Sequence, residues 1–299
     1  MTATARKYSE TELPTRGLTP NFGVEILDFD ATTATPEELA GFDAICRSNS
    51  VVLLRNQHLS AAQVVGLSSR LGRLSSQHRD GPHPDFPQIS ILSNKKVDDK
   101  LIGIHGIGRN WHTDGTTYKV LGLTTMLYGV ECPPEGGDTL LADTAAAFAT
   151  LPPERQRELE KIQVVHSRAV LINKYKKFKI DENAESMKDV IHPIVVTSPI
   201  DGRKALFLTK GSTKGMVGMD DDAAMALMSE LIELATQDRF VYHHMWKAGD
   251  VLIWNDLSTL HTATDFDDSK YDRVVYRAWA RPYELVNQTT AEEEIGPAH

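Results

Sequence analysis

Three side chains in this 299-residue sequence have the types and spacing that bind a divalent metal ion and leave it reactive. His112 and Asp114 are two residues apart, so on a β-strand both side chains project to the same face. His261 follows a second strand-like run, residues 250–254. Two imidazoles and one carboxylate on one face of an iron(II) ion leave the opposite positions open to a keto acid and to dioxygen. These three residues are the predicted metal ligands.

Further motifs accompany the three ligands in a fixed order along the chain. They are Trp-His-Thr-Asp at 111–114, Gly-Gly-Asp-Thr at 136–139, Trp254 with His261, and Arg273 with Arg277. In these motifs the chain resembles the iron(II)/2-oxoglutarate dioxygenases of the taurine dioxygenase and phenoxyalkanoate dioxygenase family. The resemblance runs from about residue 51 to about residue 281 and includes 192–195 and 202–207. It therefore covers most of the chain.

The resemblance implies a role for each matching residue. Iron(II) would be bound by His112, Asp114 and His261. The distal carboxylate of 2-oxoglutarate would be held by Thr139 and Arg273, and Arg277 would face the primary substrate. The far charge of a dicarboxylate buried beside a metal must be neutralised, and an arginine binds a carboxylate bidentately as lysine cannot. An alternative is that both arginines are exposed and pair with the acidic run at 265–268.

The resemblance also implies a reaction. Dioxygen would oxidise an unactivated C–H bond of a small anionic substrate, a carboxylate or a sulfonate, while 2-oxoglutarate is converted to succinate and carbon dioxide. An oxidative tailoring step in a biosynthetic pathway is an alternative within the family. Asp114 disfavours the halogenating branch, in which a small residue replaces the carboxylate. Substrate identity and stereochemistry stay open.

Two classes outside the family compete with this interpretation. A zinc hydrolase could use the same three ligands with a water molecule, but it gives no reason for Arg273 and the 136–139 motif. A metal-binding module without turnover would not need Arg273. The chain also departs from the family at two places, with Asn255-Asp256 in the reverse of the usual order and Thr209-Lys210 where an asparagine is expected.

The other histidines and tryptophans near these motifs receive weaker assignments. His105 lies in the glycine-rich loop 95–109, where it is a candidate substrate contact and the loop is a candidate lid, or else a plain connection. His192 is predicted to be structural. His243 and His244 should point to opposite faces of one strand, so at most one faces the site. Packing support is the predicted role of Trp111 and Trp254.

The elements that must position these residues are mostly strands. Strands are predicted at 50–54, 123–130 and 273–280, and a hairpin at 240–254 with its turn at 247–249. Helices are predicted at 61–71, capped by Ser60, at 151–161 and at 220–235. Because no regular βαβ alternation is visible, we expect a mainly β fold with helical insertions, and the resemblance specifies a double-stranded β-helix, or jelly roll. No linker or repeat divides the chain, so 1–299 is expected to be one domain.

Composition limits the partners. The net charge of −9 disfavours binding to nucleic acid or to an anionic membrane surface. No apolar run approaches the roughly 20 residues that cross a bilayer, and the first ten residues lack the apolar core of a signal peptide. Cys46 and Cys132 lie far apart, which fits a reducing cytoplasm. The expected partner is a small anionic molecule, and a homo-oligomer is possible.

Overall fold

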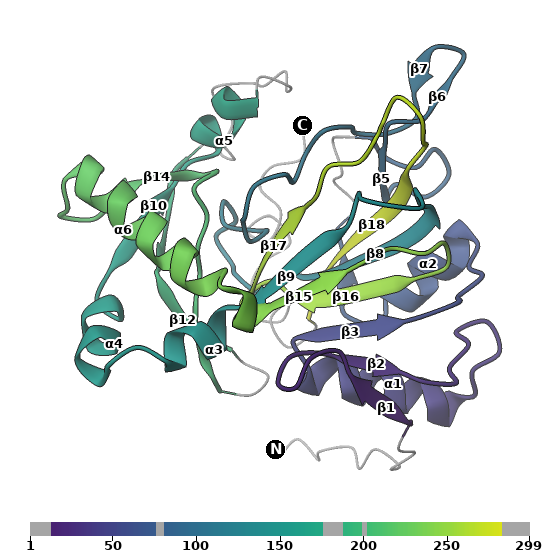
Figure 1. Cartoon of the computed structure of the whole chain (residues 1–299), viewed down its shortest axis with the longest axis horizontal. Coiled ribbons are helices and arrows are strands. Elements are labelled where there is room, and N and C mark those ends of the chain that lie inside the picture. The colour runs from purple at the N-terminus through teal and green to yellow at the C-terminus, as the bar shows by residue number, and fades with distance from the viewer. Residues whose placement is uncertain (1–12, 76–80, 176–187, 199–201, 283–299) are drawn as a thin grey trace, which may run out of the picture.

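Figure 1 shows the computed structural model, which describes residues 13–75, 81–175, 188–198 and 202–282. Strands dominate it, and helices cover them on two sides. The mainly β class with helical insertions is therefore confirmed. Within the described ranges, no helix is both long and apolar enough to cross a bilayer.

The largest sheet has eight strands. Its path is β1-β2-β3-β16-β8-β18-β4, with β5 also paired to β18. All its pairings are antiparallel except β2 with β3. The bounds are β1 Thr15–Gly17, β2 Val24–Ile26, β3 Val51–Leu54, β16 Val251–Asn255, β8 Thr124–Glu131, β18 Val274–Arg281, β4 Arg73–Leu74 and β5 Ser90–Ser93.

A second, three-stranded sheet carries two of the predicted site residues. Its order is β15 (Val241–His244), β9 (Thr139–Asp143) and β17 (Thr259–Ala263), all antiparallel. Thr139 is the first residue of β9, as the loop before it predicts, and it lies opposite Ala263 in β17. His261 lies opposite Leu141. Strand pairing therefore fixes the spacing between Thr139 and His261.

Alternating side chains of the central strands fill two separate cores. In β3, Val51 and Leu53 join the core between the two sheets, whereas Val52 and Leu54 face the other side. On that other side lie helices α1 (Pro36–Ser48) and α2 (Ala61–Ser68), which bury Phe42 and Val64 against the sheet. Burial on both faces explains why these strands are continuous apolar runs.

A long excursion leaves the small sheet after β9 and returns to it at β15. We call residues 144–240 the insertion; it occupies the left of Figure 1. It has its own core, which includes Leu159, Leu208 and Leu231. Its elements are α3 Thr144–Ala149, α4 Pro153–Leu159, β10 Gln163–His166, α5 Arg168–Tyr175, β11 Val190–Pro193, β12 Val195–Thr197, β13 Lys204–Leu206, β14 Thr213–Met216, α6 Asp221–Ala235 and the 3₁₀ turn Asp238–Phe240.

The predicted helices are present with shorter ends. Ser60 caps α2 by accepting from the backbone N–H of Gln63, and the Gln63 side chain accepts from the backbone N–H of Ser60. Asp220 caps α6 in a similar way, by accepting from the N–H groups of residues 222 and 223. Helix α4 begins at a proline, which costs nothing there because the first N–H of a helix has no partner.

Three local expectations need correction. The predicted hairpin at 240–254 is wrong, because β15 pairs with β9 in the small sheet whereas β16 pairs with β3 and β8 in the large one. The segment at 112–114 is not a strand, since only residue 112 forms a β-bridge. The loop 95–109 contains a small hairpin of β6 (Lys96–Val97) and β7 (Lys100–Leu101).

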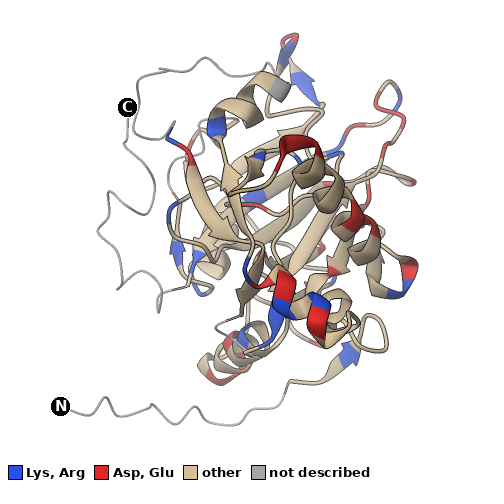
Figure 2. Ribbon diagram, turned by 90° about the vertical axis from the view of Figure 1, so that its left-hand side faces the viewer, with Lys and Arg blue, Asp and Glu red and all other residues tan. Residues whose placement is uncertain are grey.

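Charged side chains lie mainly on the helices and connecting segments around the sheets. Figure 2 shows most of the strand length without them. Arg273 directly before β18 and Arg277 in the middle of that strand are exceptions, and both are only partly exposed. Cations held among strands require a specific anionic partner.

Candidate active site

The backbone around His112 and His261 brings two distant parts of the chain together. His112 N–H donates to the carbonyl of His261 at 3.0 Å, and His261 N–H donates back at 2.8 Å. This two-bond bridge places the two imidazole rings 4.1 Å apart, centre to centre. The pairing replaces the predicted strand as the reason why the two histidines face the same point.

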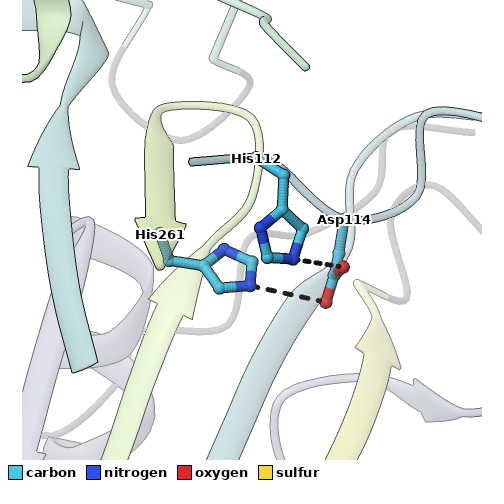
Figure 3. Close-up of side chains that lie close together, drawn as sticks. All are labelled: His112, Asp114 and His261. Carbon is cyan, nitrogen blue, oxygen red and sulfur yellow. Dashed lines mark ion pairs between the residues drawn. The ribbon is translucent and has the colours of Figure 1, made fainter. Parts of the chain in front are cut away.

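Asp114 completes the cluster. His112 Nε2 lies 3.7 Å from Asp114 Oδ1, and His261 Nε2 lies 3.9 Å from Asp114 Oδ2, as drawn in Figure 3. The three ligand atoms all lie within 4.8 Å of one another. Metal bonds to imidazole nitrogen or carboxylate oxygen are about 2.0 to 2.2 Å, so one ion can reach all three side chains.

The protonation states of the cluster suit metal binding. His112 Nδ1 lies 2.6 Å from the carbonyl of Asn110, an acceptor only, so Nδ1 donates to it and Nε2 is the nitrogen that faces Asp114. Burial, with His112 beside it, lowers the pKa of His261 to about 3, which keeps that imidazole neutral. Burial also acts against the charge of Asp114, but His261, His112 and Arg277 outweigh it and lower the pKa of Asp114.

The carboxylate of Asp114 is held by an indole. Trp279 Nε1 donates to Asp114 Oδ2 at 3.0 Å. Trp279 lies on β18, next to Thr125 of β8 in the large sheet. Hydrogen bonds from outside the ligand set orient metal ligands, and here the donor is fixed by strand pairing.

The reversed order Asn255-Asp256 has a clear structural outcome. Asn255 Oδ1 accepts from the backbone N–H of Leu257 and so shapes the turn before β17. Asp256 is buried, with its carboxyl oxygens accepting from Thr125 and from the indole of Trp254. Burial and the charge of Asp114 raise the pKa of Asp256 well above its usual range. The segment before His261 is thus held by hydrogen bonds despite the reversal.

A cavity of about 540 Å³ opens at the cluster. All the site residues that the sequence predicts line it. They are His105, His112, Asp114, Thr139, His261, Arg273 and Arg277. A single cavity therefore contains the three clustered side chains and both predicted arginines, and Arg109 and Arg168 line it as well.

Arg273 is oriented by the glycine motif. Its Nε donates to the carbonyl of Gly137 at 2.9 Å, and its backbone N–H donates to Asn94 Oδ1 at 2.8 Å. Gly137 has a φ of +65°, and a Cβ there would meet the Arg273 side chain at 3.0 Å. Burial lowers the pKa of Arg273, but an arginine stays charged in proteins.

The acidic run at 265–268 makes other contacts. Asp265 pairs with Arg109 at 2.7 Å, and Asp268 lies 3.1 Å from His105 Nε2. The alternative in which these acids neutralise Arg273 is therefore wrong. Arg277 lies over the ring of Trp279, with 4.1 Å from its Cζ to the ring centre.

The remaining histidines behave as predicted. His192 Nε2 lies 2.8 Å from the carbonyl of Tyr118, which fits a structural role. His243 is exposed beside Asp138, whereas His244 is buried on the other face of β15. Both tryptophans expected to give packing support do so: Trp111 packs against the core of the insertion, and Trp254 packs 4.8 Å from the His261 ring.

Several residues at this site were missed by the sequence analysis. Trp246, which donates to Thr139, and Trp279 carry no motif of their own. Arg168 lies on α5 and lines the cavity from the insertion, together with Ser212. The only signal for Trp279 is its position two residues beyond Arg277, which puts it on the same strand face.

Comparisons with known proteins agree with this geometry. The model of the taurine catabolism dioxygenase TauD, TfdA family matches residues 14–279. The chain is 29% identical over 267 residues to the alpha-ketoglutarate-dependent 2,4-dichlorophenoxyacetate dioxygenase of Cupriavidus pinatubonensis, covering 84% of this chain and 92% of that protein. It is 26% identical over 234 residues to pentalenolactone F synthase of Streptomyces arenae, covering 74% and 78%.

A solved structure gives the same result at the level of the fold. The crystal structure of a taurine dioxygenase from Burkholderia xenovorans has a TM-score of 0.74 and 25% identity with this chain, with 91% of each chain covered. The family match spans both sheets and the insertion. The chain therefore belongs to the TauD, TfdA family, and it is an alpha-ketoglutarate-dependent dioxygenase.

Proposed function

We propose that this dioxygenase hydroxylates a C–H bond of a small anionic substrate, a carboxylate or a sulfonate, and releases succinate and carbon dioxide from 2-oxoglutarate (alpha-ketoglutarate). One observation carries the proposal: the His112, Asp114 and His261 cluster shares a cavity with Arg273, Arg277 and the buried Thr139. The relative from Cupriavidus pinatubonensis is named for a chlorinated phenoxyacetate. An anion of that kind needs a cation near the metal.

The cluster fits iron(II). Two imidazoles and one carboxylate form the donor set that this ion takes when it must keep coordination positions open, and burial keeps the His261 imidazole neutral by lowering its pKa. In the proposed site His112, Asp114 and His261 are the ligands. When bound, the iron supplies the oxidation chemistry with dioxygen and 2-oxoglutarate. The protein orients the three ligands, holds the His261 imidazole neutral and keeps the site partly enclosed.

Thr139 and Arg273 are the proposed partners of the distal carboxylate of 2-oxoglutarate. Both line the cavity, and Arg273 is charged, largely buried and held by Gly137. A buried charge of this kind favours an anion, because pairing offsets the cost of its desolvation. Arg273 forms a charge-assisted fork for the carboxylate, and Thr139 adds a hydroxyl donor.

Arg277 and His105 are the proposed contacts of the primary substrate. Arg277 is close enough to Asp114 to lower the pKa of that carboxyl, so an anion bound to Arg277 lies near the metal. His105 stands on the 95–109 loop at the rim of the same cavity. A substrate held by its charge presents a neighbouring carbon to the metal.

The sheet pair supports the finer assignment of the core as a jelly roll. The large sheet, which is antiparallel except for β2 with β3, faces the antiparallel small sheet across the core that contains Leu53, Leu141 and Leu252. The ligands lie where the sheets open into the cavity. We also propose that the chain forms one domain and acts in the cytoplasm.

An oxidative tailoring role in a biosynthetic pathway is the second candidate. It rests on the likeness to pentalenolactone F synthase. Both candidates use the same metal, the same co-substrate and the same residues. They differ in the molecule that fills the Arg277 side of the cavity.

The test is a succinate assay with iron(II), ascorbate and 2-oxoglutarate, in air and under nitrogen. We expect oxygen-dependent succinate that increases when a substrate is added from a set of carboxylates and sulfonates. A zinc-loaded protein with iron removed should give none. Equal succinate with and without oxygen, or activity with zinc alone, would contradict the proposal.

A further inference from the structure

The indole of Trp246 makes a hydrogen bond that no part of the proposed chemistry uses. Its Nε1 donates to Thr139 Oγ1 at 3.0 Å, and both side chains are buried. Trp246 follows β15, the neighbour of β9 in the small sheet. An indole N–H is a donor only, whereas a hydroxyl has one proton and two lone pairs. The Thr139 oxygen must therefore accept.

That direction leaves the hydroxyl proton of Thr139 to be donated elsewhere. Within the described residues, no acceptor for this proton is found, although Thr139 lines the cavity. A buried donor without a partner costs about 1 to 3 kcal/mol. An anionic oxygen in the cavity satisfies it.

The same indole also lies beside Arg273. The Arg273 Cζ is 6.0 Å from the centre of the Trp246 ring, at the outer range of a cation–π contact. Trp246 is wedged in place by His244, whose ring meets it edge-on at 4.4 Å, and by Gly129, where a Cβ would lie 3.0 Å from the indole. One rigid side chain thus contacts both proposed partners of the carboxylate.

We infer that Trp246 is a positioning residue for the co-substrate. By donating to Thr139, the indole directs the Thr139 hydroxyl proton toward the distal carboxylate of 2-oxoglutarate, which Arg273 binds beside it. This inference rests on the proposed roles of Thr139 and Arg273. Without the indole N–H the hydroxyl is free to rotate, and its proton has other directions to take. The Thr139 hydroxyl can then still donate to 2-oxoglutarate, but it is no longer oriented toward the carboxylate.

The test measures binding, not turnover. Calorimetric titration of the Mn(II)-saturated protein with 2-oxoglutarate under nitrogen gives a Kd for the wild type, Trp246→Phe, Thr139→Val and the double variant. Loss of the hydroxyl in Thr139→Val should weaken binding about 10- to 100-fold, as expected for a hydrogen bond to a charged group. Trp246→Phe keeps an aromatic ring of similar position and should weaken binding about three- to tenfold.

The double variant decides whether Trp246 acts through Thr139. It should bind no more weakly than Thr139→Val alone, because without the hydroxyl there is nothing for the indole to orient. Fully additive losses would overturn the inference. So would equal binding by Trp246→Phe and the wild type.

Two controls separate positioning from damage to the fold. Mn(II) affinity and the thermal midpoint should stay at wild-type values in Trp246→Phe, and a loss of either together with 2-oxoglutarate binding would show a merely structural role. Trp111→Phe is the matched control, since Trp111 packs on the insertion core and is not a lining residue of the cavity. Failure of the wild type itself to bind 2-oxoglutarate would overturn the proposed function, which the variants alone cannot do.

Discussion

The two ends of the cavity are built differently. At one end, which we call the strand end, His261, Thr139 and Arg273 stand on or beside strands whose register is fixed by neighbours. At the other, the insertion end, Arg168 and Ser212 belong to helix α5 and to the loop before β14. The insertion packs around its own core. Shared chemistry therefore lies on the rigid end, and the insertion end can differ between substrates.

The largest expected effect is the loss of turnover when one of the proposed metal ligands is replaced. His112→Ala, Asp114→Ala and His261→Ala should each abolish turnover and weaken iron binding, because each removes one of three ligands. The fold should persist, since the bridge between residues 112 and 261 consists of two backbone hydrogen bonds that do not involve the side chains. Succinate assays at limiting iron and circular dichroism test this. Near-normal activity in all three variants would refute the metal assignment.

Arg273 and Arg277 should each serve a different ligand. Arg273→Ala should raise the 2-oxoglutarate requirement whatever substrate is offered, at a cost on the order of 2 to 5 kcal/mol for losing a buried carboxylate contact. Arg277→Ala should weaken the primary substrate and leave uncoupled 2-oxoglutarate decay comparatively unharmed. Titrations of each variant with both compounds measure the division. Equal effects on both affinities in both variants would end it.

A smaller effect, on metal affinity, is expected when the Trp279 indole that donates to Asp114 is replaced. Trp279→Phe removes the N–H donor that holds Asp114 Oδ2 and keeps a ring beneath Arg277. Metal affinity should fall about tenfold, the lower range for loss of a partner that orients a ligand. Competition with a metal-indicator dye measures it. Unchanged metal affinity with weaker 2-oxoglutarate binding would contradict the assignment of Trp279 to the metal ligand Asp114 and of Trp246 to the co-substrate.

The smallest expected effect concerns the insertion end. Burial, with His192 beside it, lowers the pKa of His166 to about 3, and burial lowers the pKa of His192. Burial favours the neutral imidazole in both, so their contribution to stability is complete above about pH 6.5 and decreases as the pH falls below it. For His166 the loss is about 1.4 kcal/mol per pH unit, down to about pH 3.

Urea unfolding at pH 7.5 and pH 5.5 tests this contribution. The wild type should be less stable at pH 5.5, and His166→Gln should show a shallower dependence on pH. The metal-free form is used for both, so that proton competition at the metal ligands is the same. A steeper dependence in His166→Gln would reverse the sign of the argument.

Sequence patterns placed the strand end well because each of its motifs carries its own chemical signal. The Gly-Gly-Asp-Thr turn leads into β9, and the two arginines lie directly before and within β18. The His-x-Asp pair lies outside any strand and is held by the backbone bridge between residues 112 and 261. The hairpin at 240–254 failed because alternation of side chains does not specify the partner strand. A six-residue connection, 245–250, carries the chain between sheets where a short turn within one sheet was expected.

The residues that orient the site were beyond these patterns. Trp246, Trp279 and Asp256 act through partners at least 100 residues away in the chain. Trp246 contacts residue 139, Trp279 contacts residue 114, and Asp256 contacts residue 125. Only the folded register of the sheets brings these pairs together. Arg168 was missed for a similar reason: a single arginine after a strand carries no motif, and only the folded chain shows that it lines the cavity.

The points at which the insertion leaves and rejoins the small sheet have an evolutionary consequence. Residue 143 ends β9, residue 241 begins β15, and these two strands are hydrogen-bonded neighbours whose paired residues include Val241 with Ala142. Anything spliced between them begins and ends at the same place, and lengthening such an excursion costs little closure entropy. Residues 144–240 are therefore a natural unit to exchange when a new substrate preference is grafted, provided that the contacts of the insertion core with Trp111 and Leu260 are kept.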